Sequence, residues 1–328
     1  MKKILCSLFC LSCLGIASFA QITTSVLLQH QSNVVVYSCD SLNAALRDAV
    51  DGDTLFLSEG TFPGFTIDKK ITVRGAGQGT IVSGDITVAI PDSATLTATL
   101  LEGFYKSRGE ITVTQPVNGF RMKQCSFYRM TLDADMEDVV IDRCHCSGYI
   151  KLAANKTDYP YVTKVRSMKV LGSRVMAFSL EAETSNYITL VNCMTKGFQN
   201  GQYFKGTVIN SIVGWPGNAQ YTYSGCAFIN SLICTYRLGF GSLYEENCWT
   251  SDDQYLVKNP GGDTFYCIYS DEELLELGYI GNDGTVIGSN GGATPYTVEL
   301  AVPKVKSADL KLDNANRLLN VNLTLTAE

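Results

Sequence analysis

The middle of the chain repeats one five-residue pattern: LVNCM (190–194), VINSI (208–212), FINSL (228–232) and EENCW (245–249). The central asparagines, spaced by 18, 20 and 17 residues, are Asn192, Asn210, Asn230 and Asn247. A period of about 20 residues, built from short β-type runs, is typical of a solenoid in which each repeat adds one coil of strands.

The repeat has a direct physical interpretation. Asparagine tolerates the left-handed backbone conformation, so we expect it at a tight bend between two strands. The Cys or Ser that follows is small enough to point into a narrow interior. KQCSF (123–127), DRCHC (142–146) and LGSRV (171–175) fit the same position without the asparagine. The longer gap between the last two predicts an insertion at about residues 155–161.

A short helix is predicted at about residues 41–50, before the first coil. Five apolar residues share one face at helical spacing, and Asp40 or Ser41 is the expected N-cap. The five are Leu42, Ala45, Leu46, Ala49 and Val50. Because a solenoid must cover its open end, this amphipathic helix is interpreted as an end cap.

The residues after this helix resemble a known family. The runs DGDTLFLSEGTF (51–62) and IDKKITVRGAG (67–77) are similar to the start of secreted right-handed parallel β-helix proteins of the pectin-lyase-like superfamily. The asparagine repeat resembles the asparagine ladder of that superfamily. DGTVIG (283–288) resembles the closing segment of β-helix proteins common in gut-type Bacteroidetes. The resemblance implies the fold over about residues 40–300. It implies no single activity, because the superfamily includes lyases, hydrolases, epimerases, tailspikes and noncatalytic adhesins.

The chain is therefore predicted to be all-β, in three parts. Residues 1–20 form a signal peptide, with Lys2 and Lys3 before an apolar run and Ala20 at the cleavage site. Residues 21–300 form the right-handed parallel β-helix, and 301–328 a C-terminal β-hairpin that packs on it. No later segment is long and apolar enough to span a membrane. We expect an exported protein of the periplasm, cell surface or extracellular space, either released or lipid-anchored.

Charge and cysteine content narrow the choice of partners. The net charge is −6 and only 18% of residues are charged, so a nucleic acid partner is not expected.

Nine cysteines follow residue 20, an odd number, and most are predicted to be small core residues. Along a strand, Cys144 and Cys146 point inward and His145 outward, so the three cannot share one metal ion.

Three acidic residues form a candidate calcium site. Asp133 and Asp135 could share one face, with Asp142 one turn away, and calcium prefers several carboxylate oxygens. The alternative is a solvated acidic loop. No other cofactor is expected.

Aromatic residues in the glycine-rich stretches form a candidate carbohydrate-binding surface. Exposed rings can stack on sugars, and the candidates are Tyr203, Trp215, Tyr221 and Tyr223. The alternative is that these rings cover contacts between loops and strands.

Three functional hypotheses follow. A hydrolase of this fold is disfavoured, because the chain has only His30 and His145, and neither is flanked by glycine. The leading hypothesis is a noncatalytic exported protein that binds a polysaccharide or other glycan, or acts at the cell surface. The alternatives are a pectate-lyase-like polysaccharide lyase acting on acidic glycans, with an arginine or lysine as base, and a structural segment of a surface assembly. The oligomeric state stays open.

Overall fold

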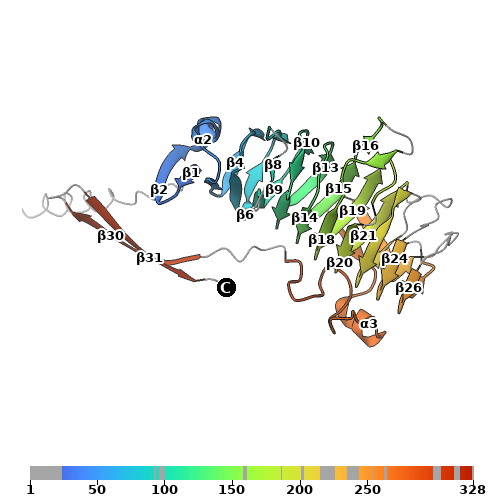
Figure 1. The fold of residues 1–328 in the computed structure, drawn as a ribbon. Coiled ribbons are helices and arrows are strands. Elements are labelled where there is room, and N and C mark those ends of the chain that lie inside the picture. Colours follow the sequence, from blue (N-terminus) through green and yellow to red (C-terminus); the bar gives the residue numbers. More distant parts are fainter. Residues whose placement is uncertain are drawn as a thin grey trace, which may run out of the picture.

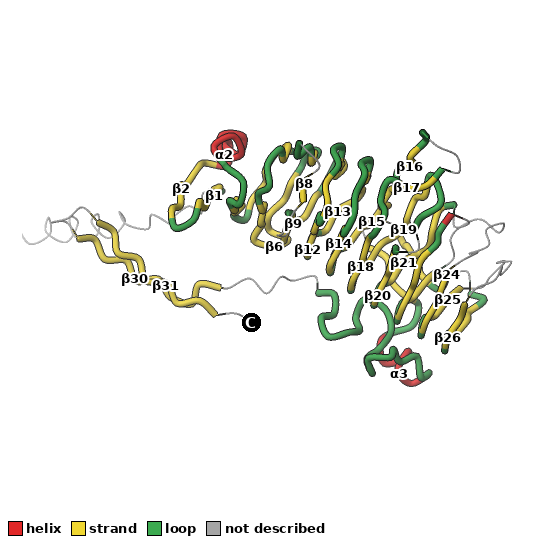
Figure 2. The backbone as a smooth tube through the Cα atoms, viewed as in Figure 1, coloured by secondary structure: helices red, strands yellow, loops and turns green. Residues whose placement is uncertain are grey.

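The strands stack as the parallel coils of a β-solenoid, which confirms the predicted fold class (Figure 1). The computed structural model describes residues 24–91, 94–95, 100–157, 161–185, 187–200, 203–214, 226–234, 244–253, 255–261, 264–297, 304–313 and 318–326. The predicted signal peptide lies outside these residues. Figure 2 shows that the helical segments lie outside the stacked strands.

Each coil contributes strands to up to three faces. The first face consists of β3 (Thr54–Leu57), β6 (Thr72–Val82), β9 (Leu101–Lys106), β12 (Arg121–Lys123), β14 (Val139–Asp142), β18 (Met168–Leu171), β20 (Ile188–Val191), β22 (Gly206–Ile209), β24 (Cys226–Ile229) and β26 (Tyr244–Glu246). The ends of β6 and β9 continue onto the second face. That face adds β4 (Gly60–Phe62), β13 (Ser126–Leu132), β15 (His145–Leu152), β19 (Arg174–Leu180), β21 (Met194–Gln199), β23 (Ile212–Val213), β25 (Leu232–Cys234) and β27 (Trp249–Ser251).

The third face is shorter. It begins with β5 (Phe65–Ile67), β7 (Ile86–Val88) and β10 (Glu110–Val113), and continues in the second halves of β13, β15, β19 and β21. Two small pairs lie at its edge: β8 (Ala94–Thr95) with β11 (Val117–Asn118), and β16 (Ala154–Asn155) with β17 (Val162–Thr163). The second pair confirms the insertion predicted near residues 155–161.

A left-handed residue separates the first face from the second. The four asparagines of the repeat have φ values of 51°, 49°, 45° and 51°. Gln124, Arg143 and Gly172 take the same position in earlier coils, with φ of 51°, 49° and 48°. Asparagine and glycine adopt this conformation at low cost, which explains their recurrence at the bend.

The residue after the bend forms a hydrogen-bonded ladder through the interior. The backbone N–H of Cys144 donates to Ser173 Oγ of the next coil at 3.0 Å. The N–H groups of Cys193 and Ser211 donate in the same way to Ser211 Oγ and Ser231 Oγ, at 3.0 and 3.1 Å. These serines are fully buried. Serine at this position is therefore both small enough for the interior and able to accept the buried N–H of the preceding coil.

The cysteines are interior residues, as predicted. None of the nine forms a disulfide bond within the described part of the chain, and six of them are buried. Burial raises the pKa of Cys193 and of Cys226 to about 12, so both thiols stay protonated at neutral pH. Cys144 and Cys146 belong to the core while His145 faces outward against Phe265 and Tyr296, which confirms the prediction for this triplet.

The N-terminal end of the core is covered by a short helix and a hairpin. Helix α2 (Leu42–Asp48) buries Leu42, Ala45 and Leu46 against the core, as predicted, and Ser41 is its N-cap. The 3-10 turn η1 (Cys39–Ser41) precedes it. Val50 was assigned wrongly to the buried face: the helix ends before it, and it is 48% exposed. Strands β1 (Ser25–His30) and β2 (Asn33–Ser38), which we did not predict, extend the first face: β1 pairs antiparallel with β3, and β2 pairs antiparallel with β1.

The last part of the chain folds outside the coils. Strands β28 (Val257–Gly261) and β29 (Thr264–Cys267) form a hairpin, followed by helix α3 (Asp271–Glu276). Strands β30 (Lys304–Asp313) and β31 (Leu318–Thr326) form the C-terminal hairpin. Residues 298–303 before it lie outside the described residues, so its packing on the solenoid stays a prediction.

Substitution Ser211→Ala tests the interior ladder. Alanine leaves the buried N–H of Cys193 without an acceptor, so we expect the free energy of unfolding to fall by about 1–3 kcal/mol. Urea denaturation measures the change. The control is Ser83→Ala, which removes an exposed hydroxyl and should cost less than about 0.5 kcal/mol. Equal effects of the two substitutions would contradict a special role for Ser211.

Lys106 provides a second test, because it is 1% exposed and its Nζ has no hydrogen-bond partner among the described residues. Burial lowers the pKa of Lys106, although Asp85 and Glu110 act in the opposite direction. The unfolded chain therefore holds this proton more tightly, and Lys106 makes stability rise as pH increases from its lowered folded pKa towards about pH 10. We expect Lys106→Met to add about 1–3 kcal/mol at pH 7 and to weaken that rise. The exposed Lys169→Met is the control; a destabilised Lys106→Met variant would contradict the interpretation.

Candidate functional site

A row of side chains runs along the outside of the second face. Register places Arg174, Met194, Ile212, Leu232 and Trp249 side by side on successive coils. Their chain neighbours point inward, so this row faces outward. From Met194 onward the row is apolar and would be exposed if nothing covered it.

Residues from the end of the chain cover the apolar part of this row. Leu256, Phe265, Leu274 and Ile287 pack on it and form a second hydrophobic cluster outside the coils. Trp249 adds a ring contact with Tyr279, at 5.1 Å between centroids. The hairpin β28–β29 and helix α3 are thus fixed against the outside of the later coils.

Residues 279–297, which we call the strap, then run back along the bend between the first two faces. Asn210 donates to Asn282 Oδ1 at 2.8 Å, and its own Oδ1 accepts from the backbone N–H of Asn282. Asn192 donates to Asp283 Oδ2 at 3.1 Å. Two asparagines of the repeat therefore shape the bend with their backbone and hold the strap with their side chains.

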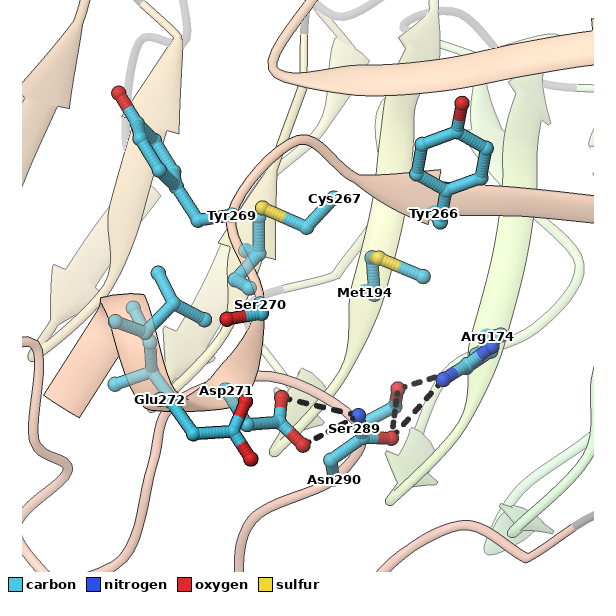
Figure 3. Close-up of a pocket in the computed structure, with 13 residues that line it drawn as sticks. Arg174, Met194, Tyr266, Cys267, Tyr269, Ser270, Asp271, Glu272, Ser289 and Asn290 are labelled. Carbon is cyan, nitrogen blue, oxygen red and sulfur yellow. Dashed lines mark hydrogen bonds between the residues drawn. The ribbon is translucent and has the colours of Figure 1, made fainter.

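A cavity of about 340 Å³ lies between the strap, helix α3 and the second face (Figure 3). Arg174 reaches into it, donating from Nε to Ser289 Oγ at 3.1 Å and from Nη2 to Asn290 Oδ1 at 3.0 Å. Asn290 in turn donates to both carboxylate oxygens of Asp271. The guanidinium also lies 4.9 Å from the ring centroid of Tyr296.

Arg174 carries its charge in a largely enclosed place. Burial lowers the pKa of Arg174, although Tyr296 and Asp271 favour its charged form. Among the described residues, no carboxylate lies within 4.0 Å of it. Its direct hydrogen-bond partners are neutral, so the cation keeps the capacity to attract an anion.

A second cavity of about 390 Å³ adjoins the first and shares Tyr266 with it. Lys196, Tyr255, Lys258 and Asn259 also line it. Lys258 is directly opposite Tyr266 in the hairpin, so the two share a face. We call the two adjoining cavities the tyrosine groove.

The walls of the second cavity combine exposed rings with positive charge. Tyr255 is 59% exposed and Tyr266 46% exposed. In the described part of the chain, neither Lys196 nor Lys258 takes part in an ion pair, and no carboxylate lines this cavity. Both cavities fall in the range of about 300–1,000 Å³ that is usual for small-molecule sites.

A further aromatic cluster on the third face is occupied by its own arginine. The guanidinium of Arg129 lies 4.7 Å from the ring centroid of Tyr128 and 4.9 Å from that of Tyr149. Each of these rings already has a cation against it, which leaves less free ring surface than Tyr255 and Tyr266 offer.

The residues predicted to bind calcium are not brought together. Asp133 follows the third face, is exposed and pairs with Lys164 at 2.7 Å. Asp135 is exposed on the same loop. Asp142 ends a strand of the first face and pairs with Arg143 at 2.9 Å. The described residues contain no cluster of three or more His, Cys, Asp or Glu that could hold a metal ion.

Most of the predicted carbohydrate-binding residues lie outside the described residues. Trp215, Tyr221 and Tyr223 fall there, and Tyr203 is partly buried against the core. The tyrosine groove was missed because its aromatic residues follow the asparagine repeat, where we placed no strands. One signal was available: NPGG (259–262) is a turn sequence between two short β-type runs, typical of a hairpin.

Neither a protein-family model nor a curated protein matches this sequence. Among the described residues, no helix combines the length and apolar character needed to cross a bilayer.

Asp283 makes the strap sensitive to acid. Burial by itself would raise the pKa of Asp283, but hydrogen bonds from Thr285 and Asn192 outweigh it and hold the pKa below its usual value. This stabilisation is present above the ordinary aspartate pKa of about 3.9 and is lost as pH falls through the lower folded value. We expect hydrogen exchange of residues 279–297, corrected for intrinsic rates, to speed up below about pH 4. Asp283→Asn should reduce that acid response, and an unchanged response would contradict the assignment.

Proposed function

We propose that this protein is an exported, noncatalytic β-solenoid that binds an acidic polysaccharide along the tyrosine groove. The observation that carries the proposal is the pair of exposed rings, Tyr255 and Tyr266, beside two lysines that have no ion-pair partner among the described residues. A tyrosine ring gives a flat apolar surface for the apolar face of a sugar, and its hydroxyl can bond the sugar's polar rim.

The cations of the groove favour a negatively charged sugar. Lys196 and Lys258 can approach a carboxylate or sulfate from the second cavity, and Arg174 is placed at the first. Arg174 and Lys196 lie on adjacent strands, two residues apart along the face, because Arg174 pairs with Met194. The cations are thus spread along the groove, which suits a chain of charged sugars better than one compact anion.

Export rests on the sequence. The first 20 residues are typical of a signal peptide, the first coils resemble secreted pectin-lyase-like proteins, and residues 283–288 resemble β-helix proteins of Bacteroidetes. These features support a place in the periplasm, at the cell surface or outside the cell, where polysaccharides are available.

Arg174 and Asp271 already form hydrogen bonds within the protein, which favours binding of the polysaccharide without cleavage. A lyase needs a base beside the sugar carboxylate, but the N–H groups of Arg174 donate to Ser289 and Asn290. Asp271 is already bonded by Asn290. The second candidate is a polysaccharide lyase, because Arg174 lines the first cavity and partial burial lowers its pKa, as suits a base. Formation of unsaturated uronides, lost in Arg174→Ala, would select the lyase.

Affinity measurements with the mature chain test the proposal. We expect binding to polygalacturonate that weakens at least about tenfold in Tyr266→Ala, equivalent to the loss of about 1.4 kcal/mol. Tyr187→Ala is the matched control, because Tyr187 is 76% exposed and does not line the groove. A folded protein that binds no polysaccharide, or equal losses in the two tyrosine variants, would contradict the proposal.

Substitution of the two lysines tests the electrostatic part of the proposal with the same affinity measurement. Lys196→Gln and Lys258→Gln should weaken binding to the acidic polymer and reduce its dependence on salt, because exposed charges are screened by ions. The control is Lys169→Gln, an exposed lysine outside the groove. A salt dependence that is unchanged in both groove variants would show that the cations do not contact the ligand.

A further inference from the structure

The N-terminal end of the solenoid carries an unprotected strand edge. Strand β2 pairs with β1, and no other strand of the described residues pairs with it. Val34, Val35 and Val36 are 55%, 49% and 66% exposed. Natural edge strands are usually protected by charge, proline or a bulge, yet β2 (NVVVYS) contains neither a charged residue nor proline. Such an edge is a site for adding another strand.

The C-terminal hairpin carries apolar residues that are suited to covering such an edge. Its register pairs Ala308 with Leu323, Leu310 with Val321 and Leu312 with Leu319. Directly paired positions share a face, so these six apolar residues belong to one face of the ribbon, and Asp309, Lys311, Asn320 and Asn322 to the other. A two-stranded hairpin is marginally stable by itself in water and needs a surface for its apolar face.

The strap brings the chain back to the end where β2 lies. It contacts Asn210 first, then Asn192 and Arg174, and ends at Thr297, which lines a small cavity with Gln78 of β6. From β6, the first face continues through β3 and β1 to β2. At about 4.8 Å per strand, a strand added to β2 lies about 19 Å from β6. Residues 298–303 can span about 20 Å when extended.

Figure 1 is in keeping with this route. The strap passes along the coils, and the hairpin β30–β31 lies at the end of the solenoid that carries β1 and β2. A tethered segment that can reach its site has a high effective concentration there. This favours the hairpin of the same chain over that of a second copy.

We propose that β2 is the docking edge for the C-terminal hairpin of the same chain, which adds to the sheet and covers the exposed valines. The hairpin thereby closes the N-terminal edge that α2 leaves open. The inference is independent of what the groove binds.

Hydrogen exchange on the full mature chain tests this docking through reciprocal effects. Val35→Lys should speed exchange in residues 304–326, and Val321→Lys should speed exchange in residues 33–38, each by about tenfold or more. Val50→Lys alters a valine that is 48% exposed outside β2, and Asn320→Lys alters the other face of the ribbon. Neither control should affect the distant segment.

The hydrogen-exchange rate of the segment that carries no substitution distinguishes docking from local unfolding of the substituted segment. If Val321→Lys unfolds the hairpin and residues 33–38 keep their exchange rates, the hairpin does not cover β2 and the proposal fails. It also fails if Val35→Lys leaves residues 304–326 unchanged. Elution of the unsubstituted protein as a dimer that Val35→Lys converts to a monomer would assign the edge to a second copy and overturn same-chain docking.

Discussion

The structure depends on one recurring constraint, the left-handed residue that follows each first-face strand from β12 to β26. Because this residue turns the chain in so short a space, the next residue enters a narrow interior where a serine or cysteine fits. At three steps the hydroxyl of Ser173, Ser211 or Ser231 accepts the backbone N–H of the preceding coil. The bend, the hydrogen-bonded ladder and the stacking of coils therefore depend on one another.

The same bend also organises the outside of the solenoid. A left-handed asparagine leaves its side-chain amide free to bond outward, and Asn192 and Asn210 use theirs to hold the strap. With the apolar row from Met194 to Trp249, this fixes α3 and the β28–β29 hairpin against the second face. A parallel β-solenoid otherwise has broad, shallow outer faces. The added layer supplies the walls that make a groove there.

Much of the fold could be predicted from the sequence, because its repeat is local. The asparagine positions, the apolar face of α2 and the inward cysteines follow from periodicity and side-chain size. The groove could not be predicted, because it joins Arg174 and Lys196 to Tyr266 and Asn290, residues that come together only when the β28–β29 hairpin and the strap fold against the second face. The calcium hypothesis shows the same limit. Asp133 and Asp142 are close in sequence, but Asp133 follows the third face of one coil and Asp142 ends the first-face strand of the next, and each has its own cationic partner.

A crystal structure with a bound uronic acid oligosaccharide would test glycan binding at the groove most directly. We predict sugar rings stacked on Tyr255 and Tyr266, with carboxylates within hydrogen-bonding distance of Lys196 or Lys258. An oligosaccharide bound instead to the third face, near Tyr128 and Tyr149, with the groove empty, would contradict the proposed site.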